Sequence, residues 1–259
     1  MAEYPEAVEA LRKIGRPDGA EGWMDYQAKG VGPEHVGDLV RLAIDPEQFT
    51  GDPDGTEVYG PIHAWRALAQ LRAAKALEPL LGLLDYLNKE SDDWMMTDMP
   101  EVLGSLGPTA LPRLAEFLAD PGKGQYPRWT VGNAIVHLAK GQPELREECV
   151  GVLTRQLERS SAGEEDPEVN GFLVSQLIDL KAVESAPVIE RAFATGNVER
   201  FIAGDWEDVR YHLGLRPDRP ARPPVRQPQQ GVRPASPKAR AEQRKSQRRK
   251  DTKQKRRKK

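Results

Sequence analysis

The side chains best suited to acid–base or nucleophilic chemistry are few and scattered along the chain. They are His35, His63, His137, His212 and Cys149. None of the histidines stands in the H-E-x-x-H spacing that places two imidazoles on one helix face for zinc binding. His63 and His137 lie in apolar, helix-like stretches, where we interpret a histidine as a packing or surface residue. The sequence therefore predicts no catalytic residue.

Cys149 is the only cysteine. It lies in a helix-spaced apolar run with Leu145, Val152 and Leu153, so we expect a core thiol rather than a nucleophile. One cysteine cannot form an intrachain disulfide or a multi-cysteine zinc site, and it fits a reducing, cytoplasmic setting. Glycine-rich nucleotide-binding loops and the G-x-S-x-G elbow do not occur in the sequence. We therefore expect no enzyme activity, no cofactor and no metal.

Three acidic stretches invite a metal-binding interpretation. The stretch DPDGTE, residues 52–57, begins like a calcium loop, but its glycine comes at the fourth position and His63 stands where the bidentate glutamate belongs. We interpret it as a turn. The other stretches are Asp92 with Asp93, and Asp205 with Glu207 and Asp208. Both precede helix-like patterns, where carboxylates complement the positive end of the helix dipole.

Charge divides this 259-residue chain into two parts. Residues 216–259 contain 18 Lys and Arg against 3 Asp and Glu, whereas residues 1–215 contain 20 basic and 37 acidic residues. All 16 aromatic residues lie before position 212, so only the acidic part is expected to bury a core. The sequence has no run of about 18 apolar residues, and its first residues lack the apolar core of a secretory signal. We expect no membrane contact.

Apolar residues recur at helical spacing through the acidic part. Leu77, Leu80, Leu81, Leu84 and Leu87 mark one face of a helix. Gly-Pro, Asp-Pro and Gln-Pro pairs separate such stretches, because proline suits the first position of a helix, where its missing N–H has no partner. No convincing alternating stretch indicates a strand, so the predicted fold class is all-α.

The predicted helices form four similar pairs. They span 62–71 with 75–87, 98–106 with 108–118, 129–138 with 143–157, and 169–180 with 183–193. The leucines that close the first helices are separated by 35, 32 and 42 residues. A period of this length is typical of an α-solenoid of stacked antiparallel helix pairs.

The pairs resemble HEAT repeats, and in particular the bacterial HEAT-like repeats related to phycobilin lyases. The residues that carry the resemblance in the first pair are Leu71, Ala76, Pro79, Leu80 and Leu81. The fourth pair is similar, with Pro187 one position early, and the match covers about residues 60–195. Residues 204–215 resemble the closing segment of bacterial HEAT-containing proteins. Some of those proteins continue into a cysteine-rich zinc tail, which this chain lacks.

The resemblance implies that the second helices line the concave face of the stack. Their polar positions are Glu78, Asp85, Arg113, Glu116, Glu147, Glu158, Glu190 and Arg191. Six carboxylates against two arginines are typical of a solvated face that keeps the protein soluble, and the alternative is a groove for a basic protein partner, in which these positions are the candidate binding residues. Trp65, Trp94 and Trp129 fall at or near successive first helices. We interpret them as space-filling residues, with a row that grips a peptide or an unstacked base as the alternative.

The basic part is interpreted as a linker and a tail. Residues 216–237 contain 7 prolines and are predicted to be an extended linker, while residues 238–259 contain 13 Lys and Arg and are predicted to be disordered. Such a charge run suits phosphate backbones, with little sequence preference, and a solubilising tail is the alternative. The candidate nucleic-acid-binding residues are Arg248, Arg249, Lys250, Lys253, Lys255, Arg256, Arg257, Lys258 and Lys259.

The predicted organisation is a helical cap, a repeat region, a linker and a tail. Residues 1–59 form the cap, with helices at 23–29 and 34–43 and a loop at 50–60, and residues 60–215 form the HEAT-like solenoid. We expect a non-catalytic scaffold that binds a protein partner, with a tail that binds nucleic acid or another polyanion. The alternative is a HEAT-like lyase acting on a partner protein, or a DNA-modifying HEAT protein.

Overall fold

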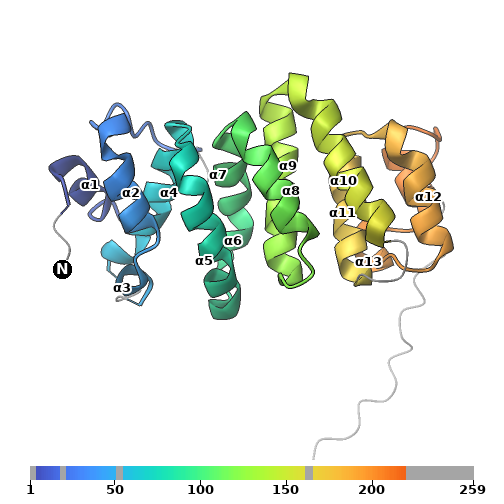
Figure 1. The fold of residues 1–259 in the computed structure, drawn as a ribbon, viewed down its shortest axis with the longest axis horizontal. Coiled ribbons are helices and arrows are strands. Elements are labelled where there is room, and N and C mark those ends of the chain that lie inside the picture. The colour runs from blue at the N-terminus through green and yellow to red at the C-terminus, as the bar shows by residue number, and fades with distance from the viewer. Residues whose placement is uncertain (1–3, 18–21, 51–54, 161–165, 220–259) are drawn as a thin grey trace, which may run out of the picture. The chain divides into compact units, whose positions relative to one another are not determined.

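A computed structural model describes residues 4–17, 22–50, 55–160 and 166–219, and all regular structure within these ranges is helical (Figure 1). This confirms the predicted all-α class for the described part of the chain. The predicted linker from residue 220 onward and the predicted basic tail lie outside the described residues. Within the described ranges, no helix is long and apolar enough to cross a membrane.

The four predicted helix pairs are present with boundaries close to those expected. The first helices are α4 (Gly60–Gln70), α7 (Met99–Ser105), α9 (Gln125–Gly141) and α11 (Pro167–Asp179). The second helices are α5 (Leu77–Glu90), α8 (Leu111–Ala119), α10 (Arg146–Ser160) and α12 (Ala186–Ala194). Three short helices complete this part of the chain: α6 (Asp93–Thr97), α13 (Arg200–Ala203) and α14 (Trp206–His212).

Each second helix begins with one turn of 3-10 helix. These turns are η3 (Ala74–Ala76), η4 (Pro108–Ala110), η5 (Pro143–Leu145) and η6 (Val183–Ser185). In three of the four connections a residue with positive φ reverses the chain: Arg72, Gly107 and Lys181. Glycine suits this role because it has no Cβ to clash in the left-handed region, and Pro108 then sets the first turn. The 3-10 turn before the second helix is therefore common to all four pairs, whereas the positive-φ residue is common to three.

Aspartates cap several helices, as their positions in the sequence predict. The Asp92 carboxylate accepts a hydrogen bond from the backbone N–H of Trp94 at 2.8 Å and so caps α6. Asp205 caps α14 by accepting from the backbone N–H of Asp208 at 3.0 Å. A side-chain oxygen at this position satisfies one of the N–H groups that a helix start leaves without a partner. Both acidic stretches therefore have a structural role.

The N-terminal part contains α1 (Glu6–Leu11), α2 (Val36–Ala43) and α3 (Pro46–Phe49), but the helix predicted at 23–29 is wrong. That segment is irregular and ends in turns. Its hydrogen bonds go to α4 instead, since Tyr26 N donates to the Gln70 amide oxygen at 3.0 Å and Gln70 Nε2 donates to Met24 O at 2.8 Å. Tertiary contacts here override a weak helical tendency.

The loop predicted at 50–60 is correct only in part. Residues Glu57–Tyr59 form a 3-10 turn, η2, that leads directly into α4 at Gly60. The stretch DPDGTE lies partly outside the described residues, which exclude 51–54. The turn at 57–59 shows that the helical region starts earlier than the proline and glycine content indicates.

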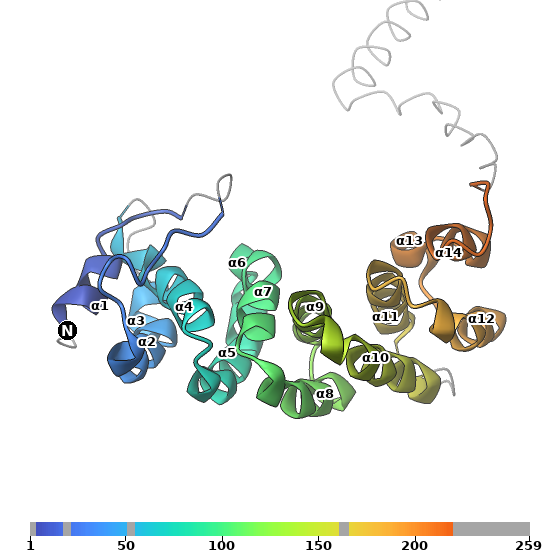
Figure 2. The ribbon, with the colours of Figure 1, turned by 90° about the horizontal axis from the view of Figure 1, so that it is seen from above.

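The helices pack in two rows. The first helices contact one another in the order α4, α7, α9 and α11, and α11 also contacts α13. In the other row, α10 contacts both α8 and α12. Figure 2 shows α5, α8, α10 and α12 along one side and α7, α9, α11 and α13 along the other. The backbones of α7 and α9 approach closely, since a Cβ at Gly104 would lie 2.6 Å from the Ala134 carbonyl oxygen. Glycine at this position lets the two backbones approach.

One continuous apolar core runs between the two rows. Leu80 and Leu84 on α5 are fully buried, as predicted. Trp65 on α4 is also fully buried, and its indole N–H donates to Ala43 O at 2.8 Å. Trp65 therefore fills space between helices, whereas Trp94 and Trp129 are half-buried.

Leu84→Ala is expected to lower the free energy of unfolding by about 2–5 kcal/mol, because the fully buried side chain leaves a cavity that its neighbours fill incompletely. Urea denaturation followed by circular dichroism measures the change. The control is Lys89→Ala on the exposed side of the same helix, which should change stability by less than about 0.5 kcal/mol. An unchanged unfolding midpoint for Leu84→Ala would contradict its assignment to the core.

Candidate partner-binding surface

We call the surface formed by α5, α8, α10 and α12 the second-helix face. Most of the candidate partner-binding residues lie on this face and form ion pairs. Glu78 on α5 accepts a hydrogen bond from Arg113 Nε on α8 at 2.7 Å, and Arg113 also lies 3.6 Å from Glu116. Asp85 on α5 pairs with Lys123, which follows α8, at 2.7 Å. These contacts join the second helix of one pair to the next.

The same pattern recurs further along the chain. Arg146 on α10 pairs with Glu184 in η6 at 2.7 Å, and Glu158 on α10 pairs with Arg191 on α12 at 3.1 Å. The four pairs that join neighbouring second helices or their flanking turns span 35, 38, 38 and 33 residues. Their spacing matches the repeat length of the sequence.

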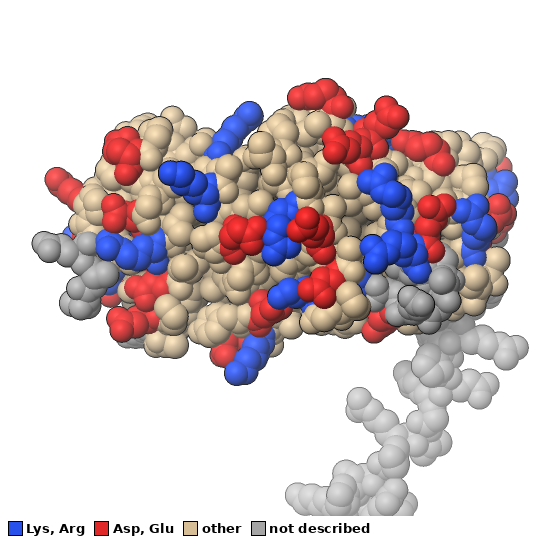
Figure 3. Space-filling view, in the orientation of Figure 1, with Lys and Arg blue, Asp and Glu red and all other residues tan. Residues whose placement is uncertain are grey.

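These ion pairs balance charge more than they stabilise the fold. Both side chains of each pair are partly exposed, and exposed ion pairs contribute only about 0–1 kcal/mol. Lys123, Arg146 and Arg155 add three cations to this face, and Glu144, Glu148 and Glu184 add three carboxylates. Figure 3 accordingly shows basic and acidic side chains interleaved across this face.

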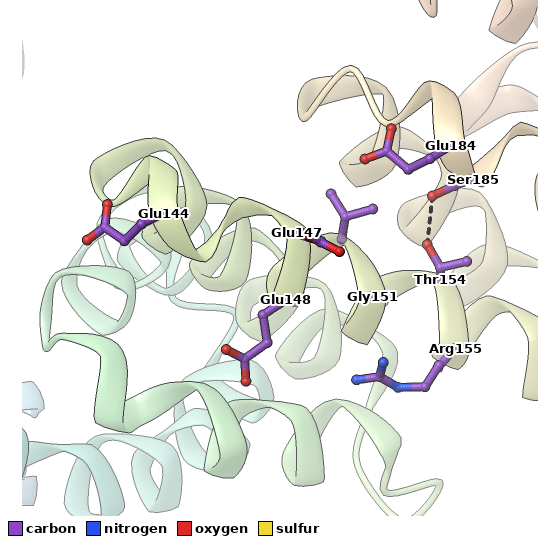
Figure 4. Close-up of a pocket in the computed structure, with 9 residues that line it drawn as sticks. Glu144, Glu147, Glu148, Gly151, Thr154, Arg155, Glu184 and Ser185 are labelled. Atoms are coloured by element: carbon purple, nitrogen blue, oxygen red, sulfur yellow. Dashed lines mark hydrogen bonds between the residues drawn. The ribbon is translucent and has the colours of Figure 1, made fainter.

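A hollow of about 600 Å³ lies beside α10 and η6 (Figure 4). Its lining includes four glutamates: Glu144, Glu147, Glu148 and Glu184. Thr154 and Ser185 meet in it through their hydroxyl groups at 2.7 Å. Glu147 here and Glu190 on α12 are the exposed candidate residues that make no ion pair within the described ranges. They leave negative charge available to a partner.

Two of the side chains suited to catalysis, Cys149 and His63, are buried in the fold, whereas His137 and His212 are exposed. Cys149 is fully buried, and burial raises the pKa of its thiol to about 11, so the thiolate is disfavoured near neutral pH. His63 is also fully buried, with its Nε2 at 2.8 Å from Gly15 O and its Nδ1 at 2.7 Å from the Tyr26 hydroxyl. A carbonyl oxygen can only accept, so Nε2 carries the proton and the Tyr26 hydroxyl donates to Nδ1.

We expect protonation of His63 to destabilise the fold in acid. Burial lowers the pKa of His63, so the unfolded chain binds more protons than the folded chain as the pH falls. The stabilisation from the neutral imidazole is complete above the ordinary histidine pKa of about 6.5 and is lost as the pH falls toward the lower folded value.

Urea denaturation between about pH 8 and pH 5 tests this linkage. His63→Gln should be less stable than wild type at pH 8 and should lose less stability on acidification. His212→Gln is the matched control, since His212 is exposed, and it should retain the wild-type fall. Parallel pH curves for wild type and His63→Gln would contradict the role assigned to His63.

Sequence reasoning missed one cluster of side chains, on α4 and at the start of α7. Arg66 and Asp98 form an ion pair in which the two side chains are only 3% and 8% exposed. The rings of Trp23 and Trp94 face the Arg66 guanidinium, with centroids 5.6 and 5.8 Å from its Cζ. The spacing of these four residues in the sequence gives no sign that they meet. Only Trp94 is among the candidate residues that the sequence indicates.

No group of histidine, cysteine and acidic side chains in the described ranges is arranged to hold a metal ion. The nine candidate nucleic-acid-binding residues between Arg248 and Lys259 lie outside the described residues. No protein-family model matches the chain, and searches of curated proteins and of solved structures find no similar protein.

Proposed function

We propose that this chain is a non-catalytic scaffold or adaptor. In this proposal the described helices form a HEAT-like α-solenoid that binds a protein partner through the second-helix face. Residues 238–259 bind nucleic acid or another polyanion. We also propose that the protein is cytoplasmic, because its single cysteine suits a reducing environment.

The observation that carries the proposal is a set of four ion pairs between neighbouring second helices or their flanking turns. Two of them join α5 to α8 or to the residues that follow it, and two join α10 to η6 or α12, so charged side chains lie along the second-helix face. Repeat architectures use such extended surfaces, rather than a single deep cleft, to bind other proteins. The exposed carboxylates without ion pairs, Glu147 and Glu190, favour a basic partner.

Affinity capture from a native cell lysate at physiological salt tests the proposal. Tagged full-length chain should retain a protein partner that resists nuclease, and a second set of partners that nuclease removes. The variant Glu147→Lys/Glu190→Lys should lose the nuclease-resistant partner, because it reverses the charge that is available to a basic surface.

The matched control is Glu6→Lys/Asp179→Lys. This variant reverses the charge at two exposed positions that lie outside the second helices. It should retain the same partner. Capture of no protein and no nucleic acid by the wild-type chain would contradict the scaffold proposal. Equal loss of the partner in both variants would contradict the location of the site.

A further inference from the structure

A second hollow, of about 500 Å³, lies where the N-terminal segment meets α4, α6 and α7. Its floor is the buried ion pair of Arg66 and Asp98, in which two guanidinium nitrogens face the two carboxylate oxygens. Because Asp98 neutralises Arg66, the floor does not present an uncompensated positive charge to a ligand.

A hydrogen-bond network fixes the position of this floor. The Tyr26 hydroxyl donates to His63, His63 donates to Gly15 O, and the Arg66 guanidinium hydrogen-bonds to Tyr26. Arg66 is therefore held from both sides, by Asp98 and by Tyr26. A buried and fully engaged arginine has little freedom to rearrange, so the hollow keeps its shape before a ligand arrives.

The walls of the hollow are aromatic. Trp23 comes from the N-terminal segment and Trp94 from α6, and each is half-buried. Both indole rings direct a face toward the Arg66 guanidinium, near the outer limit of about 6 Å for a cation–π contact. The hollow therefore already surrounds one guanidinium with electron-rich rings.

The rim of the hollow is acidic. Asp93 and Glu101 are exposed, and neither makes an ion pair with any residue that the structure describes. Since Arg66 and Asp98 compensate each other, two carboxylates remain against one cation, Arg16. This balance attracts a positively charged ligand and repels phosphate.

We propose that this hollow binds the guanidinium group of an arginine in an extended, basic partner peptide. An arginine fits better than a lysine, because a planar guanidinium stacks on indole and forms paired hydrogen bonds with carboxylates. Asp93 and Glu101 supply the carboxylates, and Trp23 and Trp94 supply the stacking surfaces. The inference rests on the proposed protein-binding function but assigns a separate anchor to other residues.

Fluorescence anisotropy of a labelled peptide, GPRPGPRPG, with the full-length chain tests the proposal. The arginine peptide should bind at least about tenfold more tightly than the same peptide with citrulline, which keeps the shape and removes the charge. The variant Asp93→Asn/Glu101→Gln should weaken the arginine peptide by about tenfold, and it alters only exposed side chains.

The matched control is Glu6→Gln/Asp179→Gln, which removes two exposed charges that line neither hollow. It should bind the peptide as wild type does. Every variant carries the same C-terminal segment, so competition from its arginines cancels in the comparison. Equal binding of arginine and citrulline peptides, or equal weakening in both variants, would overturn the proposal. Displacement of the peptide by inorganic phosphate would also overturn it, because the hollow would then be an anion site.

The two proposals can fail separately. If the arginine peptide binds in the predicted way but lysate capture recovers no partner, the scaffold proposal fails and the guanidinium site stands. If Glu147→Lys/Glu190→Lys abolishes capture while the arginine peptide does not bind, the guanidinium site alone fails.

Discussion

Asp98→Ala is expected to lower the free energy of unfolding by about 3–5 kcal/mol, because it leaves the Arg66 guanidinium buried without a compensating charge. The Arg66 side chain is only 3% exposed, so water from the hollow replaces the lost carboxylate only in part. Urea denaturation at neutral pH, followed by circular dichroism, measures the loss. Asp93→Ala, an exposed neighbour on α6, should change stability by less than about 0.5 kcal/mol.

The double variant Arg66→Met/Asp98→Leu separates the energy of the pair from the penalty of breaking it. Apolar residues of similar size often replace a buried ion pair without net loss, so this variant should recover much of the stability that Asp98→Ala loses. Its arginine-peptide affinity measures whether the polar floor of the hollow matters to binding. A cost below about 1 kcal/mol for Asp98→Ala would show that the pair is hydrated in solution.

Nucleic-acid binding by the full-length chain is expected to fall by roughly 10³–10⁵ between 50 and 200 mM salt if about 6–10 of its terminal cations engage a duplex. Each phosphate that a Lys or Arg neutralises releases condensed counterions, and added salt opposes this release. Residues 238–259 contain 13 Lys and Arg and no aromatic residue, so little preference for sequence or for stacked bases is expected.

Fluorescence anisotropy with mixed-sequence RNA and duplex DNA across a salt series measures this dependence. The comparison is a full-length variant in which the nine candidate residues, from Arg248 to Lys259, are replaced by Gln. At low salt this variant should lose most of the affinity for RNA and duplex DNA that the wild-type chain shows. Undiminished binding by this variant would contradict the assignment of binding to the tail. A preference of more than about 2 kcal/mol for one sequence would indicate base contacts.

The four helix pairs were predictable because their signals are local. Apolar spacing placed Leu80 and Leu84 in the core, and the structure confirms both. Proline at a first helical position and aspartate before it marked helix starts such as that of α11, where the Asp166 carboxylate caps the helix. These features depend on residues within one or two turns of each other, so the sequence alone contains them.

The N-terminal segment was predicted less well because its conformation is set by distant residues. Residues 23–29 look helical in isolation, yet the bonds from Gln70 to this segment and the burial of Tyr26 against His63 hold it irregular. Local propensity is a weak preference of less than about 1 kcal/mol per residue, and several tertiary contacts exceed it.

Apolar periodicity and the positions of proline are enough to predict that the described part of this chain is helical, where its four helix pairs lie, and that leucines such as Leu80 and Leu84 are buried. Which charged side chains meet depends on how the helices pack. Glu78 pairs with Arg113, 35 residues further along the chain, and Arg66 pairs with Asp98, 32 residues further along. The packing of neighbouring helices brings these side chains together. Helical periodicity gives the face on which a side chain lies, but it carries no information about the partner that a neighbouring helix brings to that face.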